Sequence, residues 1–181
     1  MEPKFIKTKF IDAFVIEPKS FPDARGYFTE SYNINDFRKN GITDTFIQDN
    51  FSFSLKGVVR GMHFQKKPHE TSKLVQCVFG EIYDVIIDIR PESPTFREWE
   101  GFVLSKENKK ILYVPKGFAH GFYVTGDCAE VSYKVDETFY PECDGAIRWD
   151  DPDINVLWPV TGEIIISDKD KNAPLLKDIT R

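Results

Sequence analysis

Cysteine is scarce in this chain, and long apolar runs are missing. The three cysteines, Cys77, Cys128 and Cys143, are an odd number and form no Cys-x-x-Cys pair, so we expect neither a disulfide framework nor a thiolate metal site. Free thiols are typical of a reducing compartment. The charged N-terminus is followed by no apolar segment, and no run is long enough to span a bilayer. We therefore expect a cytoplasmic protein that does not interact with membranes.

An excess of positive charge is missing as well. The formal net charge is −5, which argues against a general nucleic-acid binder because such proteins present a basic face. Any anionic ligand would need a local cluster of arginine and lysine. The chain of 181 residues is long enough to bury a real core, and its length predicts a single domain over residues 1–181.

Aromatic residues are abundant, and short apolar or alternating runs are separated by turn residues. This rhythm is typical of a β-sandwich or β-barrel. We expect strands at the following ranges: Phe5–Phe10, Ala13–Ile16, Tyr27–Tyr32, Phe46–Phe53, Val58–Gln65, Leu74–Phe79, Glu81–Ile89, Phe96–Leu104, Lys110–Val114, Gly121–Val124 and Ala129–Val135.

The remaining segments predict turns and little helix. Asn33 is a candidate N-cap for a short helix over Ile34–Asn40, and Asp168–Lys171 could form a short terminal helix. Phe21–Gly26 has the composition of a turn. The tail Asp144–Pro159 is rich in Asp, Pro and Trp and is expected to be irregular.

The segment Gly57–Lys73 begins as an apolar strand and ends with polar and charged residues. Because side chains of a strand alternate, His63 and Gln65 are expected on one face, with Arg60 and Met62 on the other. Our first hypothesis is that His63 lines the inside of a barrel. Taken alone, a strand histidine is more often an ordinary core residue.

Two short patterns resemble the cupin superfamily, whose fold is a jelly roll. The motif that runs from Pro115 to His120 resembles the second cupin signature, and Gly57 followed by His63 resembles the start of the first. The second metal-binding histidine of that signature is replaced here by Gln65. Because catalytic metal sites usually have three protein ligands, the pattern predicts a cupin without a metal. His69 lies in a polar loop and is expected to be exposed.

More specific motifs follow one another along nearly the whole chain: Phe21-x-Asp23-x-Arg25-Gly-Tyr-Phe-x-Glu30, Gln48-Asp-Asn50, Arg60-Gly-Met-His-Phe-Gln65, Lys73-Leu-Val, Gly80-Glu81, Asp84-Val, Pro115-x-Gly-Phe-Ala-His-Gly-Phe122, Tyr133-Lys134, Asp150-Asp151-Pro152 and Ser167-Asp-Lys-Asp170. Together they resemble the dTDP-4-dehydrorhamnose 3,5-epimerase family. The resemblance implies an all-β, double-stranded β-helix jelly roll with one or two short helices. It also implies a homodimer.

The same resemblance implies a metal-independent isomerase that converts dTDP-4-dehydro-6-deoxy-D-glucose into dTDP-4-dehydro-L-rhamnose. Epimerisation beside a ketone needs a base, a group that stabilises the enolate, and an acid on the opposite face. By resemblance, His63 is the base, Asp170 its partner, Lys73 the enolate stabiliser and Tyr133 the acid. The reference pKa values of about 6.5 for histidine and about 10 for tyrosine suit these roles.

The substrate's own ketone accepts the electrons, so the resemblance implies no cofactor. It also implies nucleotide-sugar contacts from a larger set: Arg25, Glu30, Gln48, Asp49, Asn50, Arg60, His63, Lys73, His120, Asp144 and Lys169. Arginine suits a diphosphate because its planar fork binds oxygens in pairs. Two positions depart from the family pattern: Asp144 stands where glutamate is frequent, and Ser72 stands where glycine is frequent. The shape of the loop Lys66–Ser72 and the substrate range could therefore differ from those of the family.

Three other functions stay open. A mono-epimerase or ketoisomerase for a related nucleotide sugar would use the same fold and base. A non-catalytic cupin that binds sugars or nucleotides would not need His63, Lys73, Tyr133 and Asp170 together. A metal-dependent dioxygenase cupin would need the ligands that are missing here, and metal analysis of the purified protein distinguishes it.

Overall fold

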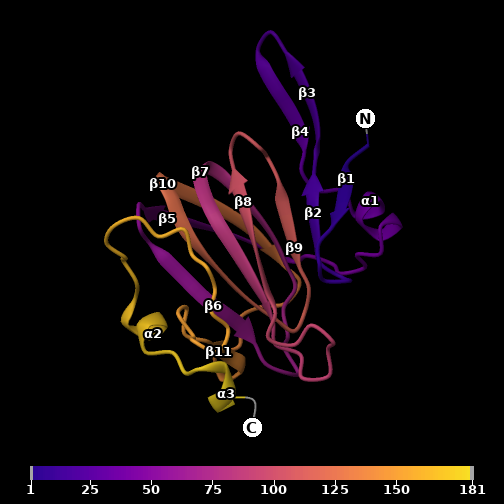
Figure 1. Cartoon of the computed structure of the whole chain (residues 1–181). Helices are drawn as coiled ribbons and strands as arrows, with labels where there is room; N and C mark the ends of the chain where they lie inside the picture. The colour runs from indigo at the N-terminus through magenta and orange to yellow at the C-terminus, as the bar shows by residue number, and fades with distance from the viewer. Residues whose placement is uncertain (1, 180–181) are drawn as a thin grey trace.

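The computed structural model describes residues 2–179, and most of its regular structure is β (Figure 1). One sheet of nine strands follows the order β1-β2-β9-β7-β10-β6-β11, with β5 paired to β10 and β8 paired to β7. Its strands are β1 Lys4–Lys7, β2 Phe14–Glu17, β5 Gln48–Leu55, β6 Val59–Gln65, β7 Lys73–Asp88, β8 Trp99–Ser105, β9 Ile111–Val114, β10 Phe118–Val135 and β11 Asp144–Ala146. The predicted cupin-like jelly roll is confirmed.

Two long strands, β7 and β10, form the spine of the sheet. The sequence predicted each of them as two shorter strands. At Gly80 the chain adopts a φ of 72° and stays in the ladder, and the extra residues of β10 form a bulge between Val124 and Ala129. The prediction of two breaks was wrong because a bulge absorbs such residues without ending a strand.

Strand β10 has two successive partners on one edge, and it thereby brings together the predicted site residues on one face of the sheet, which we call the functional face. Near its start it pairs with β6, which places His120 opposite His63. Near its end it pairs with β5, which places Tyr133 opposite Asn50. Directly opposed residues share a face of the sheet, so these side chains converge although they come from distant parts of the sequence.

The core consists of fully buried aliphatic side chains from the central strands, among them Val75, Ile82, Leu104 and Leu112. Burying one such side chain stabilises the fold by about 1.5–3 kcal/mol. A second cluster, which includes Met62, packs β6 against the C-terminal segment. This segment carries α2 and therefore lies beside the functional face (Figure 1).

Lys19–Asp23 and Gly26–Glu30 form strands β3 and β4, which pair as a two-stranded sheet of their own. This hairpin projects from the main sheet (Figure 1). The sequence assigned residues 21–26 to a turn, but only the tip of the hairpin is one. The stacked rings of Phe21 and Phe28, 6.1 Å apart, support pairing further toward the tip.

The helices are short. They are α1 Ile34–Lys39, the 3₁₀-helix η1 Pro141–Cys143, α2 Asp168–Lys171 and α3 Leu176–Ile179. The predicted cap of α1 is confirmed, since the Asn33 side chain accepts the Asn35 N–H. Between residues 2 and 179, no helix has both the length and the apolarity to cross a membrane.

Two predicted boundaries also need correction. The range Asp144–Pro159 was expected to be irregular, but it begins with strand β11, which pairs with β6. The strand predicted to begin at Phe96 begins at Trp99, because Arg97 has a left-handed φ of 71°. The pattern of apolar residues predicts neither the pairing of β11 with β6 nor the positive φ of Arg97.

The close approach of β7 and β10 at Gly80 gives a test of the pairing between these two strands. A Cβ at Gly80 would lie 1.9 Å from the Cys128 carbonyl oxygen, whereas a Cβ at Gly41, also at positive φ, would meet nothing within 4 Å. We expect Gly80→Ala to lower the free energy of unfolding by roughly 2–4 kcal/mol and Gly41→Ala by about 1 kcal/mol. Urea unfolding measures both; equal losses would contradict the predicted steric clash at Gly80.

Candidate active site

His63 is held by a buried carboxylate. Its Nε2 lies 2.7 Å from Oδ1 of Asp170, and the Gly61 N–H donates to the other oxygen of this carboxylate at 3.2 Å. Asp170 belongs to α2, whose first turn is capped by Ser167. The side chain of Asp170 is only 6% exposed, so the imidazole is its main charge partner.

Burial by itself would raise the pKa of Asp170. The hydrogen bond and positive charge of His63, together with the Gly61 N–H and Ser167, outweigh that effect and hold the pKa of Asp170 below its usual value. The carboxylate is therefore ionised at neutral pH. Because Asp170 occupies Nε2 of His63, Nδ1 is the nitrogen left to accept a proton.

A second imidazole–carboxylate pair lies beside the first. His120 Nε2 is 3.0 Å from Oδ1 and 2.9 Å from Oδ2 of Asp84. Both side chains are buried, and burial lowers the pKa of His120 although Asp84 opposes this effect. His120 is thus neutral at pH 7, and it donates Nε2–H to the carboxylate.

Lys73 is the first residue of β7 and extends into the same space. Burial lowers the pKa of its ammonium group to about 8, against the opposing charges of Asp84 and Asp144. The preceding residue is anchored, since the Ser72 N–H donates to Asp136 Oδ1 at 2.7 Å. The pocket therefore contains a lysine that is cationic at pH 7 but close to its titration range.

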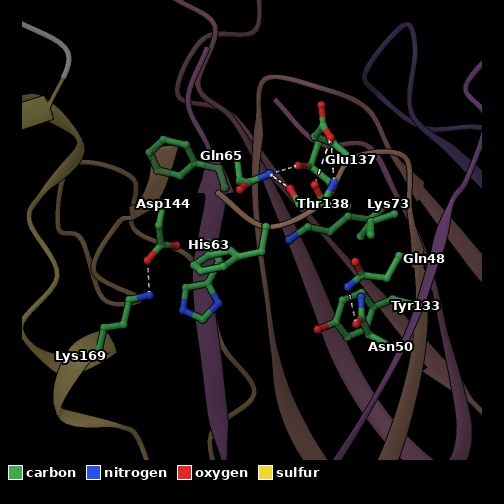
Figure 2. A pocket seen from close by; sticks show the side chains of 14 residues that line it. Gln48, Asn50, His63, Gln65, Lys73, Tyr133, Glu137, Thr138, Asp144 and Lys169 are labelled. Atoms are coloured by element: carbon green, nitrogen blue, oxygen red, sulfur yellow. Dashed lines mark hydrogen bonds and ion pairs between the residues drawn. The ribbon is translucent and has the colours of Figure 1, made fainter. Parts of the chain in front are cut away.

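His63, Lys73 and Tyr133 line two adjoining hollows of about 330 Å³ and 220 Å³. The outer hollow opens beside Asp144 and Lys169, and the inner one reaches His120. Figure 2 shows the rings of His63 and Tyr133 on opposite sides, with the Lys73 ammonium group between them. A ring-shaped ligand between the two would meet an imidazole on one face and a phenol on the other.

Arg60 was predicted to face away from His63, and this was wrong, because both line the inner hollow. From Arg60 to His63, β6 advances three residues while β10 advances only two, from Phe122 to His120. Such a bulge brings two residues of opposite parity to one face. Arg60 is held there by a hydrogen bond from Nε to Ser54 Oγ of 2.9 Å.

Most of the other predicted binding residues also line the hollows. Gln48 and Asn50 lie in the wall opposite His63, joined by a hydrogen bond of 2.8 Å (Figure 2). Asp144 and Lys169 form an ion pair at the mouth. Asp49 points away, because it alternates with its neighbours, and it bonds to Lys134 at 2.6 Å.

Arg25 and Glu30 do not line either hollow. Both belong to the β3–β4 hairpin, and Arg25 is exposed and paired with Asp23 at 2.7 Å. Since the hairpin projects from the sheet (Figure 1), neither residue meets the pocket of its own chain.

The sequence reading missed several residues that line the outer hollow, among them Thr71 and Glu137. The Gln65 amide N–H groups donate to the His69 carbonyl and to Thr71, and its oxygen accepts the Tyr140 N–H. His69 was predicted to be exposed, but it is half-buried and stacks on Tyr140 at 3.5 Å. Glu137, which follows β10, bonds to His69 at 3.3 Å. These residues lie in loops, and the only sequence signal for them is that they follow the predicted end of a strand.

A metal centre was not predicted, and among residues 2–179 no three histidine, cysteine or acidic side chains gather in the way that an ion needs. Ser52 of β5 was also missed; its hydroxyl is buried at the inner hollow without a hydrogen-bond partner within the described part of the chain. The sequence could have indicated this, because side chains of a strand alternate and Ser52 therefore shares a face with Asn50 and Ser54.

The fold and pocket together define a class: a cupin-type jelly roll whose cavity is lined by an imidazole and a phenol on opposite sides (Figure 2). The sequence profile described as dTDP-4-dehydrorhamnose 3,5-epimerase matches residues 7–178. This chain therefore belongs to the dTDP-4-dehydrorhamnose 3,5-epimerase family.

Individual relatives agree with this assignment. The dTDP-4-dehydrorhamnose 3,5-epimerase of Salmonella typhimurium is 48% identical over 94% of each chain. The crystal structure of a dTDP-6-deoxy-D-glucose-3,5-epimerase from Legionella pneumophila, in complex with dTDP-4-keto-L-rhamnose, has a TM-score of 0.94 and 44% identity over 97% of this chain and 93% of that one. A 3′-monoepimerase from Streptomyces bikiniensis is also similar, at 31% identity and a TM-score of 0.86 over 91% and 84% of the two chains.

The Asp170 pair predicts a pH dependence of stability. A carboxyl whose folded pKa is depressed stabilises the fold above its unfolded pKa, near 3.8, and loses this contribution as the pH falls through the folded value. Asp170→Asn should therefore be less stable than the wild type at pH 6, and the difference should shrink by pH 3. Urea unfolding at both pH values measures it, with exposed Asp168→Asn as the control; a difference that stays constant contradicts the linkage.

Proposed function

We propose that the chain is an isomerase that converts dTDP-4-dehydro-6-deoxy-D-glucose into dTDP-4-dehydro-L-rhamnose by inverting C3 and C5. The observation that carries this proposal is the placement of His63 and Tyr133 on opposite sides of one pocket, with Lys73 between them. Inversion at a carbon requires that a proton leave one face of the ring and return on the other. The family to which the chain belongs carries the same activity in its name.

In the proposed reaction, His63 Nδ1 takes the proton from a carbon beside the C4 ketone. The electron pair of the broken C–H bond becomes the enolate, with the negative charge on the C4 oxygen. Asp170 stabilises the imidazolium that forms, because it accepts the Nε2–H at 2.7 Å. Lys73 stabilises the enolate oxygen as a compact cation.

Tyr133 then donates its phenolic proton to the opposite face of the same carbon, and the enolate collapses to the ketone. The imidazolium returns its proton to water, and the phenolate regains one, so the enzyme is unchanged. The same steps at the second carbon give the doubly inverted product. Because the ketone of the substrate accepts the electrons, the proposed reaction needs neither a redox cofactor nor a metal.

We assign the rest of the pocket to binding of the nucleotide sugar. Arg60 and Lys169 supply positive charge for a diphosphate in an otherwise acidic protein. Gln48 and Asn50 offer amides in the wall opposite His63, and Asp144 fixes Lys169 at the mouth. These contacts would hold the ring so that the carbons beside the ketone reach both His63 and Tyr133 in turn.

Solvent exchange tests the reaction directly. With dTDP-4-dehydro-6-deoxy-D-glucose in deuterated water, the wild type should place deuterium at both C3 and C5, as followed by NMR. His63→Asn should exchange at least about 10²-fold more slowly, since a general base contributes about 10²–10⁴-fold. His69→Asn is the control, because His69 lines neither hollow and has no role in the proposed chemistry. Label at C3 alone would indicate a mono-epimerase, and a wild type that labels neither carbon would refute the proposal.

We propose that the active form is a homodimer. Strand β5 exposes a row of apolar side chains on its outer face, which includes Phe51, Phe53 and Leu55. The projecting hairpin exposes Tyr27 and Phe28. Exposed apolar patches of this kind typically become interfaces.

A twofold partner would also give a role to the hairpin residues that miss the pocket of their own chain. In a dimer, Arg25 and Glu30 could contact the substrate bound by the partner. We further propose a cytoplasmic location, supported by the free thiols of Cys77, Cys128 and Cys143.

The dimer proposal predicts a molar mass of twice the 21.0 kDa of one chain in light scattering after size exclusion. The double variant Phe51→Asp, Phe53→Asp should elute as a monomer, because two carboxylates would be buried without partners in the interface. Leu157→Asp, at an exposed position elsewhere, is the matched control. A wild-type monomer, or a dimer that survives both β5 substitutions, would contradict this interface.

A further inference from the structure

Asp84 is a fully buried carboxylate to which the proposed reaction gives no role. It lies in the middle of β7, between Phe122 of β10 and Phe102 of β8 in the sheet register. Both of its oxygens face Nε2 of His120, at 3.0 and 2.9 Å. A buried charge of this kind is destabilising unless other groups compensate for it, so its presence in β7 calls for an explanation.

The charges around Asp84 provide that explanation. Lys73, on the same strand, interacts electrostatically with Asp84 and also with Asp144 of β11. His120 experiences Asp84, Lys73 and His63 of β6. The pocket thus combines two imidazoles with an ammonium group, and each further positive charge there would be unfavourable. The Asp84 carboxylate is fully buried, hydrogen-bonds to His120 and interacts electrostatically with Lys73.

The geometry also fixes which nitrogen of His120 can meet a ligand. Because Asp84 holds Nε2, and because His120 is neutral at pH 7, Nδ1 carries a lone pair. His120 lines the inner hollow, so this nitrogen can accept a hydrogen bond from a sugar hydroxyl. Lys73 then remains as the cation for the enolate oxygen.

We propose that Asp84 is a positioning residue of the enolate site: its carboxylate fixes His120 as a hydrogen-bond acceptor and supplies the counter-charge that keeps the Lys73 ammonium protonated. This inference rests on the proposed function, since it concerns the stabilisation of the same enolate. The two imidazole–carboxylate pairs then have different roles. Asp170 stabilises the positive charge of a base that moves a proton, whereas Asp84 holds a neutral imidazole and protects the charge of a lysine.

The decisive variant is Asp84→Asn, which keeps the volume and a hydrogen-bonding amide but removes the charge. Without the negative charge, Lys73 should lose its proton at lower pH, by about one unit. The alkaline limb of the kcat profile should therefore move to lower pH by the same amount. At pH 8 kcat should fall about fivefold, because a one-unit shift from about 8 reduces the protonated fraction of Lys73 from about one half to about one tenth. The fall should be smaller at pH 6, and KM should change less than about threefold, because Asp84 does not touch the substrate.

The protonation of Lys73 is also measured without substrate. Acylation of the protein at a series of pH values, with the extent at Lys73 read by mass spectrometry, gives its midpoint, expected near 8 in the wild type. If the wild type exchanges no substrate hydrogen, the proposed function fails, yet this titration still decides whether Asp84 protects the Lys73 charge.

Asp88→Asn is the matched control. Asp88 is also fully buried on β7, but it bonds to Arg90 and the hydroxyls of Ser93 and Thr95. This variant should lose stability without moving the Lys73 midpoint or the pH profile. If Asp84→Asn behaves in the same way, Asp84 is purely structural and the inference is overturned.

Asp84→Glu keeps the charge and displaces the carboxylate, so it remains informative if the asparagine variant does not fold. We expect the Lys73 midpoint to stay within about half a unit of the wild type, while kcat falls about tenfold because His120 shifts. A midpoint that drops by a full unit in this charged variant would overturn the proposed role of the counter-charge.

Discussion

The pocket depends on the pairing of each imidazole with a buried carboxylate. Asp170 holds His63 at 2.7 Å, and Asp84 holds His120 at about the same range. At a buried position, an unpaired charge would either destabilise the fold or be lost by a pKa shift. The pairs therefore explain how several ionisable groups can lie together inside a jelly roll.

The sheet topology explains how these pairs meet. β10 joins β6 along one part of its edge and β5 along another, while β7 follows it along most of its length. One long strand thus places His120 beside His63 and Tyr133 across from them. The C-terminal segment contributes Asp170 from outside the sheet. His63 and Tyr133 are therefore held apart by rigid strands, and this placement suits the base and acid roles proposed for them.

The two carboxylates differ in what they contact, and this difference supports different roles. His63 is partly exposed toward the hollow, with 38% of its side chain accessible, whereas His120 is almost fully enclosed at 9%. An accessible imidazole with a charged partner is suited to gain and lose a proton. An enclosed imidazole that remains neutral is suited to hold one hydrogen-bonding geometry.

The sequence by itself determined the all-β class, the cap of α1, the short helix at Asp168–Lys171 and the residues whose motifs carry the family resemblance. It could do so because apolar alternation and capping residues act locally. Only the tertiary structure decided that Arg60 shares a face with His63, that Asp84 belongs to the pocket, and that Arg25 and Glu30 stand apart from it. The first two facts depend on a bulge and on cross-strand register, which arise from contacts between residues that are far apart in the chain. The third depends on the direction in which a local hairpin projects from the main sheet (Figure 1).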